Sequence, residues 1–332
     1  MSIKPTWRIP ILLFIAFSIF ILCIYFVPWL ELFEEPAIWF NQYSEVLRNL
    51  AFLIVAVVGA PMAIWRTTLS SKNSKIAYKN TEIADRNSFT DTFTKAIEQL
   101  GATTAENKPN IEVRLGAIYA LEKLSKVNSD YYQPIIDILC SYVRQHAPYQ
   151  QESEQIGSGQ TRIDVQTVLT VIGRRGLIDN EPRLNLASVY LRGINLKDAN
   201  LHEANLMGAG LMGADLTRAN LGCADLIKAN LIKANLSGAN LSGADLRGAR
   251  MVRANLGEAD LRGARMVSAH LGGADLYGAN LMGANLLGAD LHGARMVKAD
   301  LHRADLTKTI DLTKEQLMEA KNWGSSKHDL EL

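Results

Sequence analysis

Side chains that could catalyse a reaction or hold a metal ion occur in this sequence of 332 residues, but they form no recognised constellation. Histidine, the most versatile of them, occupies six scattered positions: His146, His202, His270, His292, His302 and His328. None belongs to an H-E-x-x-H metal-binding helix, and the three cysteines form no C-x-x-C pair. Phosphate-binding G-x-x-x-x-G-K loops and G-x-S-x-G nucleophile motifs are also missing from the sequence. We therefore predict a protein that is not an enzyme, with no catalytic residue, metal site or cofactor.

Carboxylates are placed more regularly, and a pair of them could act as general acid and base. In the C-terminal third they occupy a fixed position before a leucine, as in Ala244-Asp245-Leu246, and asparagine takes the same position elsewhere, as in Ala199-Asn200-Leu201. Asn and Asp side chains bond to nearby backbone and tolerate unusual dihedral angles, which suits the corners of a chain. We interpret these carboxylates as corner residues that the repeat imposes.

A five-residue period in the C-terminal third of the sequence predicts the structure that positions these residues. Every fifth residue from Leu186 to Leu306 is Leu or Met, and from Ala199 to Ala304 an alanine stands two residues before each of them. Five residues turn an α-helix by ~500°, so successive leucines would spiral around it. On a strand, an odd period would place alternate leucines on opposite faces. The pattern therefore predicts a solenoid whose chain turns a corner about every five residues.

The repeated A-[D/N]-L-x-x motif resembles the pentapeptide-repeat proteins. The resemblance implies a right-handed quadrilateral β-helix at residues 183–310, with four pentapeptides in each coil and about six coils, roughly 30 Å tall at the spacing between strands. After it, Thr313 and Gln316 form the pattern of a capping box, which predicts a C-terminal capping helix within 311–323. We expect residues 324–332 to form a disordered tail.

The N-terminal residues 1–66 have the pattern of a transmembrane hairpin. Ile9–Leu30 and Val46–Trp65 are apolar runs long enough to cross a ~30 Å hydrocarbon core. The segment between them, residues 31–47, has four glutamates and no Lys or Arg, whereas basic residues lie on the outer side of both runs. The positive-inside rule then places both termini in the cytoplasm. A cleaved signal peptide is the alternative for the first run, but that run is long and a second one follows it.

Residues 67–182 are predicted to form a helical stalk and a small all-α module. Ser88 is expected to begin one amphipathic helix and Asp130 to cap another. The order of segments resembles a group of bacterial membrane-anchored pentapeptide-repeat proteins of unassigned function. Four stretches carry this resemblance: Phe93–Gly101, Val113–Leu124, Tyr142–Pro148 and Asp164–Arg175. It implies a two-pass protein of the bacterial inner (plasma) membrane.

The charge of the repeats bears on function. A known activity in this family is mimicry of DNA by an acidic β-helix that occupies a type II topoisomerase, which requires a strongly negative surface. Residues 184–310 hold 11 acidic side chains (nine Asp, two Glu) and 14 Lys or Arg, a difference of +3. This balance disfavours mimicry of DNA. The arginines are spread over several sides and few aromatic residues accompany them, so we expect no nucleic-acid partner.

One surface feature remains after these exclusions. The residue after each central Leu should face outward, and positions 20 residues apart should lie on one side of the coil. Column A then contains Met207, Ile227, Arg247, Val267 and Leu287. Column B, on the adjacent side, contains Met212, Ile232 and Val252. The apolar members of both columns are the candidate interaction surface, although Met and β-branched residues also simply suit strands.

These observations favour a non-enzymatic, membrane-anchored cytoplasmic scaffold or protein-interaction module. Its partner would be an unidentified protein or a second copy of the chain. Two alternatives stay open from the sequence. One is a DNA-mimic inhibitor of a type II topoisomerase. The other is an accessory subunit of a membrane transport or secretion complex, for which Arg48 at the membrane boundary is the one hint.

Overall fold

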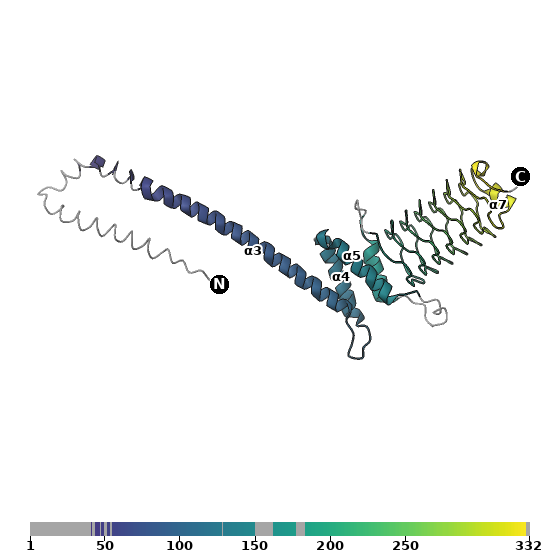
Figure 1. Ribbon diagram of the computed structural model, residues 1–332, viewed down its shortest axis with the longest axis horizontal. Coiled ribbons are helices and arrows are strands. Elements are labelled where there is room, and N and C mark those ends of the chain that lie inside the picture. Colours follow the sequence, from purple (N-terminus) through teal and green to yellow (C-terminus); the bar gives the residue numbers. More distant parts are fainter. Residues whose placement is uncertain are drawn as a thin grey trace. The chain divides into compact units, whose positions relative to one another are not determined.

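The computed structural model describes residues 41, 44–46, 48–49, 52–53, 55–127, 129–149, 162–176 and 183–329 (Figure 1). The chain folds as two compact units, Met1–Asp85 and Arg86–Leu332. This division differs from the expected one, which separated the helical module from the repeats near residue 182. In the structure the module and the repeats share one hydrophobic core.

The first unit holds a π-helical turn, η1 (Val55–Gly59), and the start of the long helix α3 (Ala60–Leu100). The expected helix start at Ser88 is wrong, because α3 continues through it without a break. No Gly or Pro interrupts the helix between Ala84 and Leu100, and mid-helix hydroxyls are accommodated by bonds to the preceding turn, as Thr92 Oγ1 bonds the Ser88 carbonyl at 2.8 Å.

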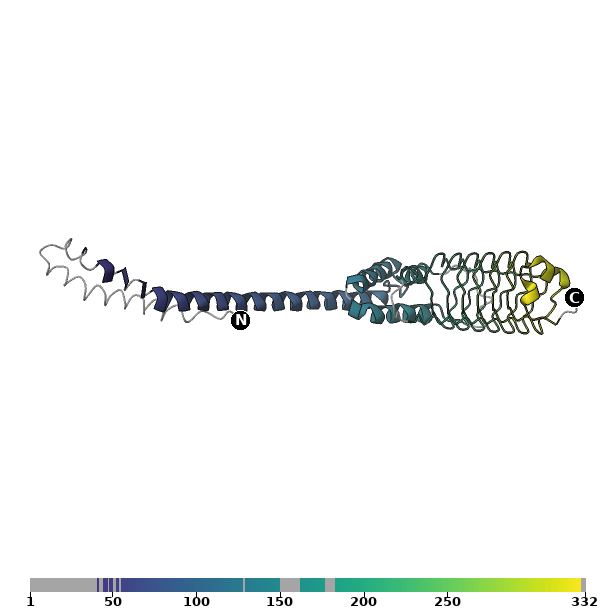
Figure 2. The same ribbon diagram turned by 90° about the horizontal axis from the view of Figure 1, so that it is seen from above.

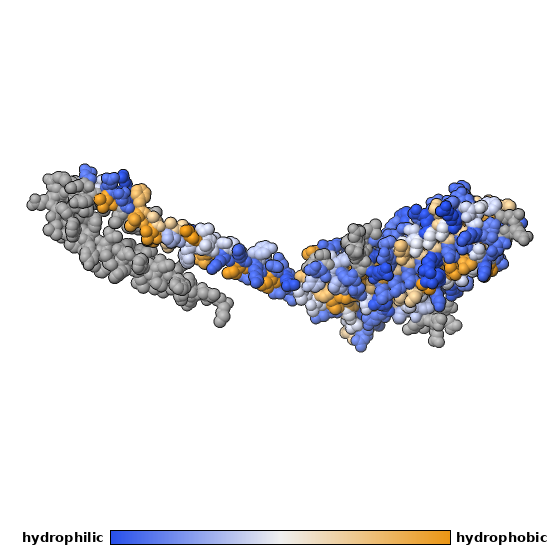
Figure 3. Space-filling view, turned by 45° about the horizontal axis from the view of Figure 1, so that its top comes forward, coloured by the Kyte–Doolittle hydropathy of each residue, from blue (hydrophilic) through white to orange (hydrophobic). Residues whose placement is uncertain are grey.

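The apolar runs expected to cross a membrane lie largely beyond the described residues. Ile9–Leu30 is wholly outside them, and Val46–Trp65 is described only in part. In the described part of the second run, Val57 and Ile64 are 64% and 65% exposed, and Figure 3 shows the first turns of α3 as hydrophobic. Among the helices of the described residues, none has the length and apolar character that a membrane span requires.

Three further helices build the small module of the second unit: α4 (Ile111–Val127), α5 (Tyr132–His146) and α6 (Ile163–Gly173). The last turns of α3 pack on it through buried Ala96 and Leu100. Asp130 does not cap α5 as expected. It lies in a 3-10 turn, η2 (Ser129–Tyr131), and Tyr131 takes the N-cap position without a side-chain cap.

The repeats form a β-helix with four sides to each coil. Parallel bridges join residue i to residue i+20 along the whole stack, from Asn185 with Asn205 to Asp290 with Ile310. Each side supplies a single bridge residue, so the described residues contain isolated bridges and no longer strand. Figure 2 shows the coils stacked between the helical module and α7.

The corners explain the fixed spacing of the sequence. The residue two places after each central Leu adopts a positive φ, such as 67° at Gly243 and 56° at Lys228. Glycine suits this left-handed backbone because it has no Cβ. The Asx residue before the central Leu accepts a hydrogen bond from the backbone two residues on, as Asp225 Oδ1 does from the Ile227 N–H at 3.0 Å. The expected corner role of Asn and Asp is confirmed.

Leucine and alanine fill the inside of the coil. The central residues from Leu201 to Leu301 are fully buried, including the three methionines that replace leucine: Met251, Met266 and Met296. Backbone hydrogen bonds also join each coil to the next one. The Leu221 N–H donates to the Asn240 carbonyl and the Leu241 N–H donates to the Asp260 carbonyl, both at 2.7 Å. Stability is therefore shared between neighbouring coils, as the solenoid architecture requires.

The helical module closes the N-terminal end of the β-helix, which the sequence did not predict. Helix α6 covers the first coil: the Gly173 carbonyl accepts from Asn200 N–H at 2.9 Å, and a Cβ at Gly173 would lie 2.8 Å from the Ala199 Cβ. Gln166 bonds both the N–H and the carbonyl of Asn195, at 3.0 and 2.8 Å. These bonds satisfy backbone groups that an open end would leave unpaired.

The C-terminal end is closed by α7 (Lys314–Glu319), with the predicted capping box between Thr313 and Gln316. The Gln316 amide also donates to the carbonyls of Leu291 and Ala294, at 2.9 and 2.8 Å. The next residues differ from the disordered tail that we expected from 324 onward. A 3-10 turn, η4 (Trp323–Ser325), is followed by Lys327, which extends the ladder by pairing with Asp305.

Candidate interaction surface

The structure places every member of columns A and B on the outside of the coil. Met207 is 45% exposed, and six other members are half-buried: Met212, Ile227, Ile232, Val252, Val267 and Leu287. The columns are continuous because Gly208 N–H donates to the Ile227 carbonyl and Gly213 N–H donates to the Ile232 carbonyl, both at 2.9 Å. Figure 3 shows hydrophobic patches on the otherwise mostly hydrophilic β-helix.

Arg247 interrupts column A, but its guanidinium group is paired with a neighbouring carboxylate. Its Nε and Nη2 donate to the two carboxylate oxygens of Asp245, each at 2.7 Å. Arg265 from the next coil lies 3.1 Å from the same carboxylate. Burial of Asp245 favours its neutral form, but the bonds from Arg247 outweigh this effect and hold the pKa of the carboxyl below its ordinary value. The arginine thus lies folded over a paired acid.

The other two sides have a more polar character. The third side carries Thr217, Ser237, Gly257, Tyr277 and Val297. The fourth side carries His202, Gly222, Ser242, Arg262, Met282 and His302. Ion pairs also lie around the coil, joining Asp260 to Arg262 at 2.6 Å and Asp275 to Arg295 at 3.1 Å. Arg295 stacks over the Tyr277 ring, 4.7 Å from its centroid.

The histidines are not gathered into a site. His202 and His302 lie on one side of the coil, five 20-residue steps apart. The backbone of His270 forms a parallel bridge with Asp290 of the next coil, two residues before His292. In the described part of the chain, no group of three or more His, Cys, Asp or Glu side chains could hold a metal ion.

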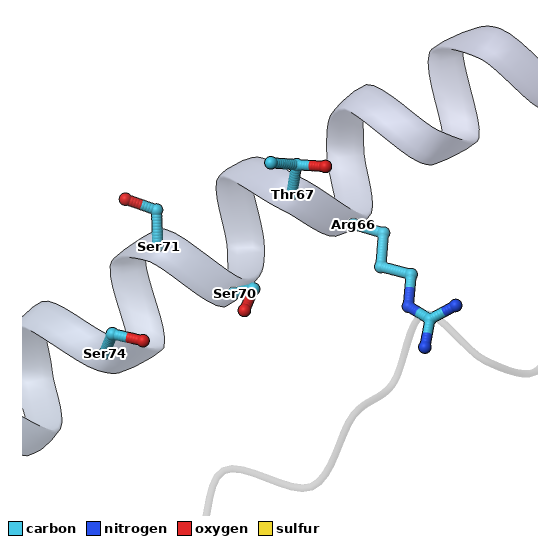
Figure 4. Close-up of a pocket in the computed structure, with 5 residues that line it drawn as sticks. All are labelled: Arg66, Thr67, Ser70, Ser71 and Ser74. Carbon is cyan, nitrogen blue, oxygen red and sulfur yellow. The ribbon is translucent and has the colours of Figure 1, made fainter.

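A hollow of about 460 Å³ lies along α3, lined by Arg66, Thr67, Ser70, Ser71 and Ser74. Figure 4 shows Arg66 and Ser70 on one side of the helix and Ser71 on the opposite side. A single helix supplies all the described lining residues, so the side chains do not converge on a ligand.

A buried polar cluster in the helical module was missed by the sequence analysis. Asp164, at the start of α6, is fully buried and accepts from Tyr142 Oη at 2.7 Å and from Arg162 Nη2 at 2.5 Å. Arg114 of α4 is 4% exposed; its Nη1 lies 3.5 Å from Asp164, and its Nε donates to the Ala102 carbonyl at 3.0 Å. Polar residues at these positions gave no periodic signal, because the cluster is assembled from three segments.

The electrostatics of this cluster indicate a structural role, in which paired charges join the helices of the module; we call this cluster the lock. Burial favours the neutral form of Asp164, but the hydrogen bonds from Arg162 and Tyr142 prevail, so the pKa of the carboxyl is lowered. Burial, followed by the bond to Asp164, raises the pKa of Tyr142 to about 12. The side chains of Arg114, Tyr142, Arg162 and Asp164 bond to one another. The cluster holds α4, α5 and α6 together.

Comparison with known proteins agrees with the coil geometry. The family model for pentapeptide repeats matches eight copies, at residues 185–222, 209–248, 249–286 and 274–310. The chain belongs to the pentapeptide-repeat proteins. No curated protein matches it significantly.

Several solved structures are similar to this one, among them two of pentapeptide-repeat proteins. A protein from the thylakoid lumen of Arabidopsis thaliana shares 33% identity over 33% of this chain and 73% of its own length, with a TM-score of 0.29. A protein from Nostoc shares 36% identity over 33% of this chain and 84% of its own, with a TM-score of 0.27. QnrB1, a plasmid-mediated fluoroquinolone resistance protein, shares 22% identity over 45% of this chain and 76% of its own, with a TM-score of 0.36.

Proposed function

We propose that this pentapeptide-repeat protein is a non-enzymatic, membrane-anchored scaffold whose β-helix binds a protein partner through columns A and B. The observation that supports this most is the juxtaposition of two outward apolar columns on adjacent sides. Met207, Ile227 and Ile232 lie within two neighbouring coils and keep part of their apolar surface in water. Contiguous exposed apolar surface on a rigid frame is typical of a protein-binding site.

The fold suits this role because the surface is preorganised. Its backbone is bonded coil to coil, so binding orders few additional groups and loses little conformational entropy. The folded position of Arg247 over Asp245 leaves the arginine paired, and a partner that covers column A need not neutralise a free charge there.

The membrane anchor is the second part of the proposal. The apolar runs Ile9–Leu30 and Val46–Trp65 would form a two-pass hairpin in the inner (plasma) membrane of a bacterium, with both termini in the cytoplasm. Its support is the charge pattern: Lys4 and Arg8 precede the first run, Arg66 and Lys72 follow the second, and residues 31–47 have no Lys or Arg. Arg48 lies at the inner end of the second run.

Topology can be tested by labelling single cysteines in intact cells with a membrane-impermeant reagent. We expect a cysteine at Glu35 to react from outside, because that residue lies in the loop between the two runs. A cysteine in the C-terminal tail should react only after the cells are opened. Labelling of the tail in intact cells would overturn the proposed orientation.

The alternative functions have less support. Mimicry of DNA requires an excess of unpaired negative charge, whereas Asp198, Asp245, Asp260 and Asp275 each form an ion pair with arginine. An accessory role in a transport or secretion complex would act through the two apolar runs, and Arg48 forms an exposed pair with Glu45 at 3.8 Å. Co-purification of the two-run fragment with a transporter would favour that role.

Two charges placed on the columns should abolish binding without unfolding the coil. We expect the double variant Ile227→Glu, Ile232→Glu to lose cross-links that mass spectrometry maps to the β-helix, because each carboxylate would have to be desolvated in the interface. A loss of at least tenfold in cross-link yield is expected, since one buried interface position contributes 1–2 kcal/mol or more.

The matched control is Ser237→Glu with Ser242→Glu, which places the same charge on the other two sides. Circular dichroism should show both double variants folded, and the control should keep the cross-links. If the two double variants behave alike, the columns are only strand-compatible residues, and the binding surface lies elsewhere.

A further inference from the structure

A seven-residue repeat runs along the exposed part of α3 and is unrelated to the pentapeptides. Leu69, Ile76 and Ile83 are spaced by seven and are 41%, 58% and 47% exposed. Four residues after each of them stands an asparagine, at Asn73, Asn80 and Asn87, and all three are exposed. In heptad notation the apolar residues occupy d and the asparagines occupy a.

A period of seven has a specific structural meaning. Seven residues on a straight α-helix fall ~20° short of two full turns, so this seam stays on one face only if the helix winds around a partner in a left-handed supercoil. A helix that covered a globular core would instead follow a period of 3.6 residues. No described residue outside α3 covers Leu69, Ile76 or Ile83, which agrees with a partner beyond this single chain.

We propose that α3 pairs with α3 of a second copy of this chain as a parallel, in-register coiled coil along Leu69–Asn87. Asparagine at a selects this partner. In a parallel pair with matched register, each a residue faces the same residue of the other chain, so Asn73, Asn80 and Asn87 each meet their counterpart. Their amides can then bond to each other across the seam. A parallel shift by one heptad would leave one asparagine of each chain without a counterpart, and an antiparallel pair would place the asparagines opposite the apolar d residues, with their hydrogen bonds unmade.

The charges beside the seam favour the same orientation. The g positions are Lys72, Lys79 and Arg86. In an antiparallel pair g residues face g residues, which would bring these cations together. In a parallel pair g faces the e position five residues on, so Lys72 and Lys79 face Ala77 and Ala84 of the second copy, and Arg86 faces its Asp91.

The seam ends where α3 joins its own module. Thr90 takes the next d position, and Phe89 and Phe93 contact Tyr131, with ring centroids 4.2 and 5.9 Å apart. The self-pairing segment and the module-binding segment thus follow one another along α3. The pairing would bring two β-helices together, independently of columns A and B.

Disulfide trapping in the full-length chain tests the pairing. Cys23 and Cys223 are first replaced by serine, while buried Cys140 is kept. We expect Leu69→Cys alone and Ile83→Cys alone each to form a covalent dimer on mild oxidation, because in a parallel, in-register pair each residue meets itself. The control is Tyr78→Cys, at the outer f position and 75% exposed, which should yield at least tenfold less dimer.

Three results would overturn the proposal. The first is a dimer only when the Leu69→Cys and Ile83→Cys chains are mixed, which indicates antiparallel pairing. The second is equal yield from Tyr78→Cys, which indicates random collision. The third is no dimer from either d position. A further change, Asn80→Asp, should lower the yield at Ile83→Cys severalfold through facing carboxylates, while Tyr78→Asp should leave it unchanged.

Discussion

Replacement of Leu241 by Asp is expected to unfold the middle of the β-helix. Leu241 is fully buried, and its backbone is bonded to Asp260 of the next coil. The variant loses about 2–3 kcal/mol of apolar burial and must either bury a carboxylate, which costs several kcal/mol more, or open the coil. Together these losses approach the whole stability of a typical domain, about 5–15 kcal/mol. Limited proteolysis should then cleave within the repeats, whereas the native chain resists cleavage there.

Ser242→Asp, one residue further on, is the matched control. Ser242 lies on the outside of the coil and is half-buried, with its backbone N–H 3.0 Å from Asn240 Oδ1. The change removes the 2.7 Å hydrogen bond from Ser242 Oγ to Asn240 Oδ1, but the added carboxylate can reach water, so we expect a loss of about 1 kcal/mol, far below that of Leu241→Asp. If both variants are cleaved at the same rate, the inward and outward phases of the repeat are assigned wrongly.

Replacement of Asp164 by Ala is expected to loosen the helical module by about 3–5 kcal/mol. The change leaves the buried guanidinium of Arg114 without its anionic partner, and an uncompensated buried charge is strongly destabilising. Hydrogen exchange at α4 and α6 should accelerate by about 10²- to 10⁴-fold. The double change Arg114→Met with Asp164→Leu removes both charges and should restore most of the protection. Slow exchange in the single variant would contradict the proposed lock.

The same carboxylate makes the stability of the module depend on pH. Because the pKa of Asp164 is lowered in the folded state, its contribution is present above the unfolded pKa of about 3.9 and is lost as pH falls through the folded pKa. The native chain should therefore lose more protection of α6 between pH 6 and strongly acidic pH than the Arg114→Met, Asp164→Leu variant loses.

The β-helix could be predicted from sequence because each position plays the same role in every coil. A leucine such as Leu241 packs against the equivalent residues of the neighbouring coils. Asp225 accepts a hydrogen bond from a backbone N–H only two residues away. The capping box of Thr313 and Gln316 was also predicted, since its pattern is local. In each of these cases the information lies within a few residues of the position concerned.

What could not be predicted depends on contacts between segments that do not repeat. The Arg114–Asp164 pair joins residues 50 positions apart, and the closure of the first coil depends on Gly173 meeting Ala199. Ser88 was taken as a helix start because Ser favours N-caps, but the surrounding helix-forming residues continue α3 through it. The tail expected to be disordered is instead ordered at Lys327, because Lys327 pairs with Asp305 at the last edge of the β-helix.

The proposal that columns A and B form a binding surface is tested most directly by photo-cross-linking in living cells. A photoreactive phenylalanine analogue would be introduced at Ile232 in column B or at Ser242 on the fourth side, with the full-length chain expressed at its native level. We expect a discrete adduct from position 232 that is lost in the Ile227→Glu background, and no adduct from position 242. Equal adducts from both positions, or adducts from position 242 alone, would contradict it.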